Sequence, residues 1–257
     1  MRLDKFLVAT GCCSRSEAKK YARKGAVTVN GTAAKTSDMN IDENNDEVIF
    51  CGRKILYRQF TYVMLNKPEG VVSATEDGRD VTVLDLLPAD VRTRGMFPCG
   101  RLDKNTLGLV LLTDDGELAH KLLAPKSHVK KLYRYSSKFP VSPEDAQRFE
   151  AGLTLEDGYE TKPAEIKLDD DRLGGYITLV EGKYHQIKRM LEALDNKITY
   201  LERVEFGPLT LDPLLDRGEW RYLTDKEEKN KIEPSTLYLV ATPIGNLADL
   251  SARALKV

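Results

Sequence analysis

The aliphatic run from Leu107 to Leu112 limits what this chain can fold into more than any other segment. The run is short, and the turn-forming residues Asp114-Asp115-Gly116 follow it, so we predict a buried core strand. The glycine-led loop Gly100-Arg101-Leu102-Asp103 comes just before it. Asp103 is therefore expected at the rim of a rigid sheet, where a carboxylate is well placed for chemistry. For an isolated Arg-x-Asp pair the simpler explanation is that Asp103 caps a turn and Arg101 pairs with a surface acid.

The composition is typical of a globular protein, with 257 residues that can form one large domain or two unequal ones. No segment approaches the ~18 consecutive apolar residues of a membrane helix, and no apolar signal core follows the first five residues. The four cysteines lack paired CxxC spacing, and the three histidines are scattered. We therefore expect a cytoplasmic protein with reduced thiols, no metal site and no membrane association.

The net charge of −1 hides a basic N-terminal region. Residues 1–37 contain eight Lys or Arg against two acids, and residues 38–47 then contain five acids and no base. Leu3, Phe6 and Leu7 have helical spacing, and Ser14-Arg15-Ser16-Glu17 is a capping box that predicts a second helix ending at Gly25. Clustered positive charge on a small helical module suits a phosphate backbone, although a solvated helix face explains it about as well.

The order of segments in this region carries further information. Val27 and Val29 lead into Asn30-Gly31, a hairpin signal, and a strand is predicted at 48–50 with 52–60 as a linker. Together with the two helices, this order resembles the αL RNA-binding motif, which implies recognition of RNA by shape and phosphates. The predicted RNA-contacting residues here are Arg2, Lys5, Arg15, Lys19, Arg23 and Lys24.

From Thr61 onward the pattern changes to strands and short helices. We predict strands at 62–65, 132–139 and 177–180 and helices at 83–87, 117–124 and 143–153, the last with Ser142 as its N-cap. A further helix opens in 182–191, with Ile187, Met190 and Leu191 on its buried stripe. Lys183, Lys188 and Arg189 suggest an anion facing this helix, whereas basic side chains that extend into solvent are the competing explanation.

Four ordered motifs then define a resemblance. They are Asn66-Lys67-Pro68-x-Gly70, Gly100-Arg101-Leu102-Asp103, Pro125-x-x-x-Val129-x-Lys131-x-Tyr133 and Glu181-Gly182-Lys183-Tyr184-His185-Gln186-Ile187-Lys188-Arg189-Met190. With the basic head, residues 1 to about 230 resemble the RsuA-type pseudouridine synthases, which modify ribosomal RNA. The Tyr184-His185-Gln186 variant and the segment through Trp220 and Tyr222 look most like the branch that acts on small-subunit (16S) rRNA.

This resemblance implies conversion of one uridine to pseudouridine without cofactor or metal. Asp103 matches the catalytic aspartate, and Lys188 matches the cation that keeps a sheltered carboxylate charged. Tyr133 matches the tyrosine that stacks on the base and helps to remove the C5 proton, while Arg101 would orient the loop or a phosphate. Three routes are compatible with it, namely addition of the aspartate to C1′, addition to the ring, and a glycal route. Lys183, His185, Gln186 and Arg189 are predicted to contact RNA.

Other classes of function remain open at this point. A binding-only RNA module leaves the motifs around Asp103 unexplained, and a glycosidase needs a second carboxylate about 5–10 Å from the first. A metal-dependent nuclease could use Asp114, Asp115 or the run Asp169-Asp170-Asp171, but such runs beside glycine are usually turns.

The C-terminal segment differs in character from the rest. Thr242-Pro243-Ile244-Gly245-Asn246-Leu247 follows a predicted strand and resembles the opening of an RsmI-type rRNA 2′-O-methyltransferase, too short to build its cofactor site. An ordinary last strand and helix of the synthase is the alternative.

The predicted fold is α+β. It has an RNA-binding domain and linker in 1–60, a catalytic domain in 61–231 with a mixed, mainly antiparallel sheet flanked by helices, and a truncated methyltransferase-like tail in 232–257. The expected partner is 16S rRNA or a small-subunit assembly intermediate, and the protein is expected to be a monomer.

Overall fold

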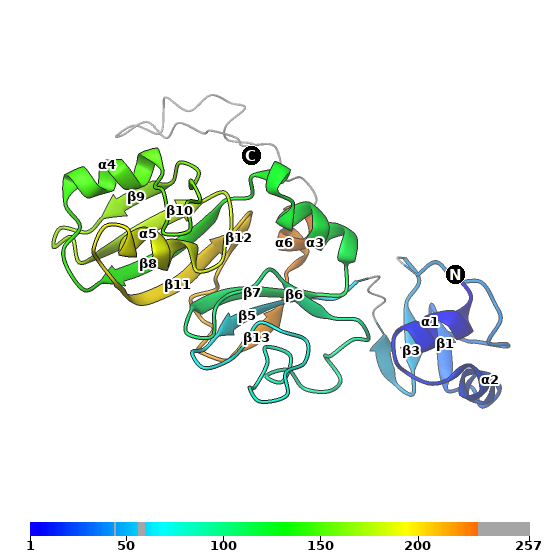
Figure 1. The fold of residues 1–257 in the computed structure, drawn as a ribbon. Coiled ribbons are helices and arrows are strands. Elements are labelled where there is room, and N and C mark those ends of the chain that lie inside the picture. Colours follow the sequence, from blue (N-terminus) through cyan, green and yellow to red (C-terminus); the bar gives the residue numbers. More distant parts are fainter. Residues whose placement is uncertain (44, 56–59, 231–257) are drawn as a thin grey trace, which may run out of the picture. The chain divides into compact units, whose positions relative to one another are not determined.

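The computed structural model describes residues 1–43, 45–55 and 60–230 (Figure 1). The chain forms two compact units, Met1–Thr61 and Tyr62–Val257. The predicted tail at 232–257 lies outside the described residues. No helix in the described ranges is long and apolar enough to cross a membrane.

The first unit packs two helices on a four-stranded antiparallel sheet with strand order β2-β1-β3-β4. Its elements are α1 (Leu3–Ala9), α2 (Arg15–Arg23), β1 (Val27–Val29), β2 (Thr32–Ala33), β3 (Val48–Phe50) and β4 (Arg53–Ile55). The predicted apolar stripe Leu3, Phe6 and Leu7 is buried, which confirms the first helix. The capping box is also confirmed, because the Glu17 amide donates to Ser14 Oγ and the Ser14 amide donates to Glu17 Oε2.

The interpretation of residues 52–60 as a linker is wrong in part. Arg53–Ile55 forms β4 and pairs with β3 in the register Phe50 to Arg53. The turn between them is Cys51-Gly52, and both residues have positive φ, 50° and 80°. That combination matches a two-residue hairpin turn whose twist suits the flanking strands. The last strand of the unit therefore follows a hairpin turn. The sequence does not indicate this turn clearly, because a cysteine occupies its first position.

The second unit is built on a nine-stranded sheet with the order β13-β5-β7-β11-β8-β10-β9, to which β6 adds at β7 and β12 at β11. The strands are β5 (Tyr62–Lys67), β6 (Phe97–Cys99), β7 (Leu107–Thr113), β8 (Lys131–Ser137), β9 (Glu165–Leu168), β10 (Gly174–Leu179), β11 (Ile198–Phe206), β12 (Leu209–Thr210) and β13 (Trp220–Tyr222). Within the described sheet, β7 and β11 form the one parallel pair. The predicted mixed, mainly antiparallel α+β architecture is confirmed.

Helices cover parts of this sheet. They are α3 (Gly116–Leu123), the short 3-10 helix η1 (Pro125–Ser127), α4 (Pro143–Ala151), α5 (Gln186–Glu192) and α6 (Asp225–Asn230). In Figure 1, α4 lies beside β9, α5 beside β11 and α3 beside β6. The Ser142 N-cap of α4 is confirmed, since Ser142 Oγ accepts from the Asp145 amide at 3.0 Å.

The helix predicted at 83–87 is wrong. Residues 83–86 form consecutive turns, in which the Asp85 amide donates to the Thr82 carbonyl and the Leu87 amide to that of Leu84. The Asp85 carboxylate accepts from both the amide and the hydroxyl of Thr82, at 2.9 Å each. Pro88 follows directly, so no room is left for helical hydrogen bonds beyond a single turn.

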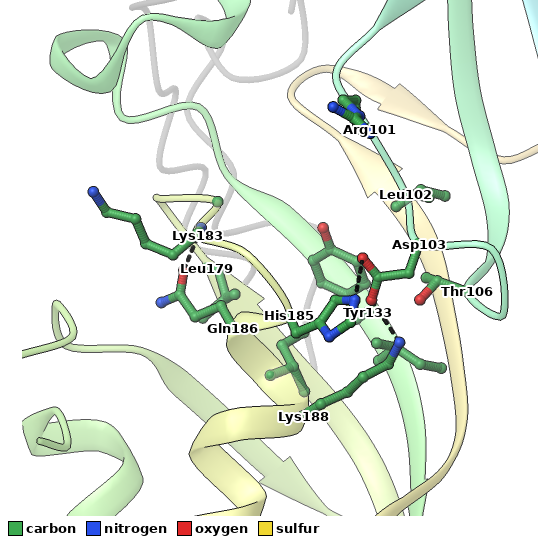
Figure 2. Close-up of a pocket in the computed structure, with 13 residues that line it drawn as sticks. Arg101, Leu102, Asp103, Thr106, Tyr133, Leu179, Lys183, His185, Gln186 and Lys188 are labelled. Atoms are coloured by element: carbon green, nitrogen blue, oxygen red, sulfur yellow. Dashed lines mark hydrogen bonds and ion pairs between the residues drawn. The ribbon is translucent and has the colours of Figure 1, made fainter. Parts of the chain in front are cut away.

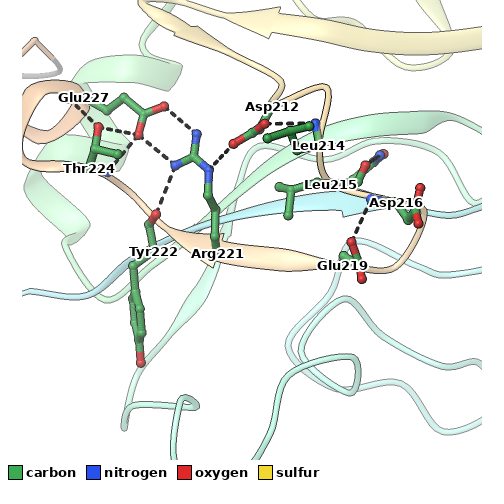
Figure 3. A network of polar contacts seen from close by, with 10 residues as sticks. Asp212, Leu214, Leu215, Asp216, Glu219, Arg221, Tyr222, Thr224 and Glu227 are labelled. Atoms are coloured by element: carbon green, nitrogen blue, oxygen red, sulfur yellow. Dashed lines mark hydrogen bonds and ion pairs between the residues drawn. The ribbon is translucent and has the colours of Figure 1, made fainter.

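A polar network holds α6 to the sheet (Figure 3). Arg221 on β13 donates to Asp212 at 2.6 Å and to both carboxylate oxygens of Glu227 at 2.8 and 2.9 Å. Glu227 also accepts from the amide and hydroxyl of Thr224, which caps the helix. These contacts lower the pKa of Glu227 to about 2, with the hydrogen bond from Arg221 as the main cause.

Candidate active site

The site is built around the loop that joins β6 to β7. Gly100 has a φ of +84°, so the chain turns sharply as it leaves β6. The Thr106 amide then donates to the Asp103 carbonyl at 3.0 Å and closes a turn just before β7 begins. Val110, Leu111 and Leu112 are fully buried in β7. The predicted core strand is thus confirmed, and it anchors Asp103 at the edge of the sheet.

A buried lysine fixes this loop through hydrogen bonds to its main chain. Lys67, at the end of β5, is 0% exposed, and its ammonium group donates to the carbonyls of Pro68, Lys104 and Thr106 at 3.1, 3.1 and 2.7 Å. Burial lowers the pKa of Lys67 to about 8, while the negative charges of Asp103 and Glu69 oppose that shift. Two of these carbonyls belong to Lys104 and Thr106, so Lys67 fixes the main chain directly after Asp103. Lys67 was predicted only as part of a motif, and its bracing role has no local sequence signal.

Ser73 braces the same loop from another side. Its hydroxyl donates to the Leu102 carbonyl at 3.0 Å and accepts from the Leu102 amide at 3.1 Å. The residue next to Asp103 therefore has both main-chain groups satisfied by one side chain. Sequence reasoning did not single out Ser73, because the contact joins residues 29 positions apart.

The Asp103 carboxylate lies among basic groups (Figure 2). Lys188 Nζ is 2.5 Å from Asp103 Oδ2 and donates to Asn105 Oδ1 at 2.6 Å. His185 Nε2 lies 3.5 Å from the other oxygen, Oδ1. The side chain of Lys188 is only 16% exposed, so this ion pair is more strongly shielded from solvent than a surface pair. The predicted meeting of Lys188 with Asp103 is found.

An open pocket surrounds this carboxylate, and Tyr133 forms part of its wall. Tyr133 comes from β8, where it pairs with Arg203 of β11, and its side chain is largely buried. In Figure 2 its ring lies beside the Asp103 carboxylate, on the side of His185. Leu102, Leu179, Ile187 and Leu201 supply apolar surface. The pocket therefore combines one carboxylate, one aromatic face and several cations.

The segment that carries His185 and Lys188 is itself held firmly. Gln186 is 4% exposed, and its side chain accepts from the Lys183 amide at 2.9 Å and donates to Glu181 at 2.6 Å. Glu181 also accepts from the Tyr159 hydroxyl at 2.9 Å. His185 has a φ of 49°, so α5 begins directly after a left-handed residue. His185 directs its imidazole toward Asp103, and Lys188 lies in the first turn of α5.

Comparison with known proteins identifies the family to which a chain with this site belongs. A family model described as RNA pseudouridylate synthase matches residues 61–193, and a model of the S4 domain matches residues 1–48. The chain belongs to the RNA pseudouridine synthase family. Its domain organisation is an S4 domain followed by the synthase domain.

Curated relatives and a solved structure support this placement. The chain is 46% identical over 230 residues to the uncharacterized RNA pseudouridine synthase YtzG of Bacillus subtilis, covering 88% of this chain and 96% of the relative. It is 40% identical over 228 residues to ribosomal small subunit pseudouridine synthase A of Vibrio cholerae, covering 88% and 97%. A crystal structure of a pseudouridylate synthase matches with a TM-score of 0.62 at 35% identity, covering 90% of this chain and 99% of the other.

The other residues predicted to contact RNA or to orient the loop in the synthase unit differ in exposure and in their contacts. Arg101 is exposed at the pocket, and in Figure 2 its guanidinium points away from Asp103. Lys183 is exposed with its ammonium group 4.7 Å from the centre of the Tyr159 ring. Gln186 and Arg189, predicted to contact RNA, are engaged within the protein, Gln186 as described above and Arg189 in a 2.5 Å ion pair with Asp157. For these two, the observed role is to brace the loop and the helix.

In the S4 unit, the predicted basic residues lie on the surface. Lys5, Arg15, Lys19, Arg23 and Lys24 are all exposed. Arg2 is partly neutralised by Asp4 at 2.7 Å, and both line a surface hollow together with Lys5 and Arg15. The face around this hollow remains net positive, which suits an anionic partner.

The acid runs considered for a nuclease have structural partners. Asp115 caps α3 through the Leu118 amide and accepts from the Tyr62 hydroxyl at 2.6 Å, and Asp114 accepts from the Thr93 hydroxyl at 2.8 Å. Residues 169–171 form the turn between β9 and β10. The described part of the chain contains no cluster of three His, Cys, Asp or Glu that could hold a metal. Among the described pocket-lining residues Asp103 is the one carboxylate, unlike the paired acids of a glycosidase.

Proposed function

We propose that this protein converts a specific uridine of 16S rRNA to pseudouridine, with Asp103 as the catalytic carboxylate. The observation that carries this proposal is the single carboxylate in the pocket, paired with Lys188 at 2.5 Å beside the ring of Tyr133. The family supplies the reaction, and several relatives named as ribosomal small subunit pseudouridine synthase A support the choice of rRNA.

In the proposed reaction the N1–C1′ bond breaks, the base rotates within the pocket, and C5 bonds to C1′. The proton on C5 is lost and N1 gains one, so the product is an isomer and needs no cofactor. Asp103 must be charged to act on the sugar or the base, and Lys188 stabilises that charge in a sheltered site. Tyr133 offers its ring to the base and is the group proposed to help remove the C5 proton.

The target uridine must leave its helix to reach Asp103, at an unstacking cost of a few kcal/mol. We propose that the exposed cations at the pocket help to meet this cost by binding the phosphates on either side. Arg101 is suited to this role because its exposed guanidinium, which points away from Asp103, has no ion pair among the described residues. Lys183 and His185 are proposed to contribute to the same surface.

The S4 unit is proposed to bind rRNA through Arg2, Lys5, Arg15, Lys19, Arg23 and Lys24. In this proposal residues 1–60 form the RNA-binding domain and residues 61–231 the catalytic domain, acting as a monomer in the cytoplasm. The substrate is 16S rRNA or an assembling small subunit. The segment 232–257 is proposed to derive from the start of an RsmI-type methyltransferase, joined to the synthase by fusion of neighbouring reading frames. Resequencing the locus tests this proposal, and an intact synthase gene with no methyltransferase sequence joined to it would refute it.

Pseudouridine mapping of rRNA from a deletion strain tests the main proposal. Loss of one mark in 16S rRNA, restored by the wild-type gene, is the expected result, whereas loss of a mark in 23S rRNA would reassign the target. The Asp103→Asn variant should bind rRNA as the wild type does, yet lose at least about 1,000-fold in activity, because the amide cannot supply the negative charge. Activity retained by this variant would refute the role of Asp103.

A further inference from the structure

Tyr184 is an aromatic residue in an unusual position. It is 76% exposed, although it directly precedes the pocket-lining His185. Its ring stacks on the imidazole of His185, with the ring centres 3.8 Å apart and an angle of 17° between the planes. An aromatic side chain with one face covered and most of its area in solvent leaves its other face free for a flat partner.

The stack joins this surface to the reaction centre. His185 covers one face of Tyr184, and its Nε2 lies 3.5 Å from Asp103 Oδ1. A base beside the Asp103 carboxylate would lie near the Nε2 edge of the imidazole, and a base on the outer face of Tyr184 would stack on the ring that covers the imidazole. The two positions would suit neighbouring nucleotides of one strand, one inside the pocket and one outside it.

The loop keeps the ring in this place. His185 has a left-handed backbone conformation, and the buried Gln186 ties the loop to Glu181 and to the Lys183 amide. Tyr184 itself belongs to neither the described core clusters nor the hydrogen bonds that brace the loop. The loop is therefore held in place by hydrogen bonds, although the exposed ring that it carries contributes little to folding.

Flipping a base creates a need that such a ring can meet. When the target uridine leaves the stack, each neighbouring base loses a stacking partner on one face. Aromatic side chains replace such contacts at about 1–3 kcal/mol per base, largely irrespective of base identity. Lys183, the exposed residue before Tyr184 in the chain, adds positive charge to this loop for the RNA backbone.

We propose that Tyr184 is a stacking platform for the base next to the target uridine, and thereby a substrate-binding residue of this site. The proposal rests on the proposed function, since it requires an RNA whose uridine reaches Asp103. The proposed partner of the Tyr184 ring is a nucleobase rather than a protein.

The first test compares Tyr184→Ala and Tyr184→Phe on 16S rRNA transcripts, with Phe139→Ala as control. Phe139 is also exposed, at 51%, but its chain neighbours do not line the pocket, whereas those of Tyr184 do. Loss of stacking by about 1–3 kcal/mol corresponds to a rise in KM of about 5- to 150-fold for Tyr184→Ala, with kcat within about twofold. The Phe variant keeps the aromatic face and should behave as the wild type does. An unchanged KM for Tyr184→Ala would refute the proposal.

The second test identifies the partner. Once the modified uridine is mapped, binding of a short stem-loop is measured in the Asp103→Asn background, with an abasic sugar placed on the 5′ or the 3′ side of the uridine. One of the two abasic substitutions should weaken binding when Tyr184 is present and have little further effect in Tyr184→Ala. Equal losses with and without the tyrosine ring, on both sides, would refute stacking and leave a protein partner as the explanation for its exposure.

These outcomes separate the two proposals. If wild-type protein forms no pseudouridine in rRNA, the proposed function fails. If wild type and Phe139→Ala are active and Tyr184→Ala matches them in KM and in the abasic experiment, only the platform is refuted.

Discussion

Gly108 and Arg203 approach each other so closely that a β-carbon on Gly108 would lie 2.3 Å from the Arg203 carbonyl oxygen. This contact lies in the parallel pairing of β7 with β11, which joins the two halves of the sheet. The Arg203 side chain strengthens the same junction, because its Nε donates to the Leu109 carbonyl at 2.9 Å. Asp103 lies just before β7 in the chain, and Tyr133 of β8 pairs with Arg203 of β11. The geometry of the pocket therefore depends on this junction.

Gly108→Ala should therefore be strongly destabilising. The substitution combines a clash with backbone atoms and a φ of +98°, and we expect a loss of more than about 3 kcal/mol in the free energy of unfolding. Urea denaturation of the full chain measures this. Gly78→Ala is the matched control, because its β-carbon would meet nothing within 4 Å, and it should change stability by about 0.5 kcal/mol or less. Similar stabilities for the two variants would contradict the close approach.

Lys67→Met should slow catalysis more than it weakens RNA binding. The variant removes three hydrogen bonds, two of them to carbonyls of the Asp103 loop, while keeping an unbranched side chain of similar length. Displacement of a catalytic group by about 1 Å costs on the order of 100-fold in rate, so we expect kcat to fall by about 10- to 100-fold. Single-turnover assays and RNA titrations measure the two effects separately. Lys104→Met, which removes an exposed ion pair with Asp80, should leave kcat unchanged.

The lowered pKa of Lys67 also predicts a pH dependence of stability. Its folded-state pKa is about 8, below the ordinary value of 10.5, so the unfolded chain binds more protons between these pH values. The free energy of unfolding should then rise with pH across this window, by up to about 1 kcal/mol per pH unit. The difference between wild type and Lys67→Met isolates this contribution from those of other groups. A difference that stays constant from pH 7 to 10.5 would be inconsistent with a buried ammonium group.

Lys188→Met should abolish most activity without unfolding the protein. The Asp103 carboxylate would lose its closest cation, and we expect kcat to fall by about 100-fold or more. Asn105 also loses its partner, but it is exposed and can bond to water. Lys121→Met is a suitable control, since its ion pair with Glu117 lies on the surface of α3. A pseudouridine yield unchanged in Lys188→Met would refute the role of Lys188 at the Asp103 carboxylate.

Local signals in the sequence predicted many elements, because caps and turns depend on nearby residues. Ser14, Ser142 and Asn30-Gly31 each mark a boundary that the structure has. The long strand β11 was missed, because Glu202, Arg203 and Glu205 interrupt its apolar pattern. Its central position comes from pairing with β7 and β8 on either side, which no window of sequence reveals.

The candidate site divides in the same way. Asp103, Tyr133 and Lys188 could be predicted from motifs, and the structure brings them together. Lys67 reaches the carbonyls of Lys104 and Thr106, and Ser73 reaches Leu102, all 29 or more positions away, so their contribution depends on the fold rather than on a local pattern. The same holds for Gln186, whose hydrogen bonds within its own loop no local pattern indicated.

The network around Arg221 makes a final prediction, for acid pH (Figure 3). Glu227 has a folded-state pKa of about 2, below the ordinary value of 4.5, so it stabilises the native state fully above pH 4.5. That contribution is lost as the pH falls toward 2, because protonation removes the charge that Arg221 contacts. Glu227→Gln should therefore lower the free energy of unfolding by about 2 kcal/mol at pH 7 and by progressively less between pH 4.5 and 2. Urea denaturation at pH 7, 5, 4 and 3 measures the difference, with Glu117→Gln as control because its ion pair is on the surface. A difference that is the same at pH 3 and pH 7 would mean that α6 is held by packing rather than by this charge.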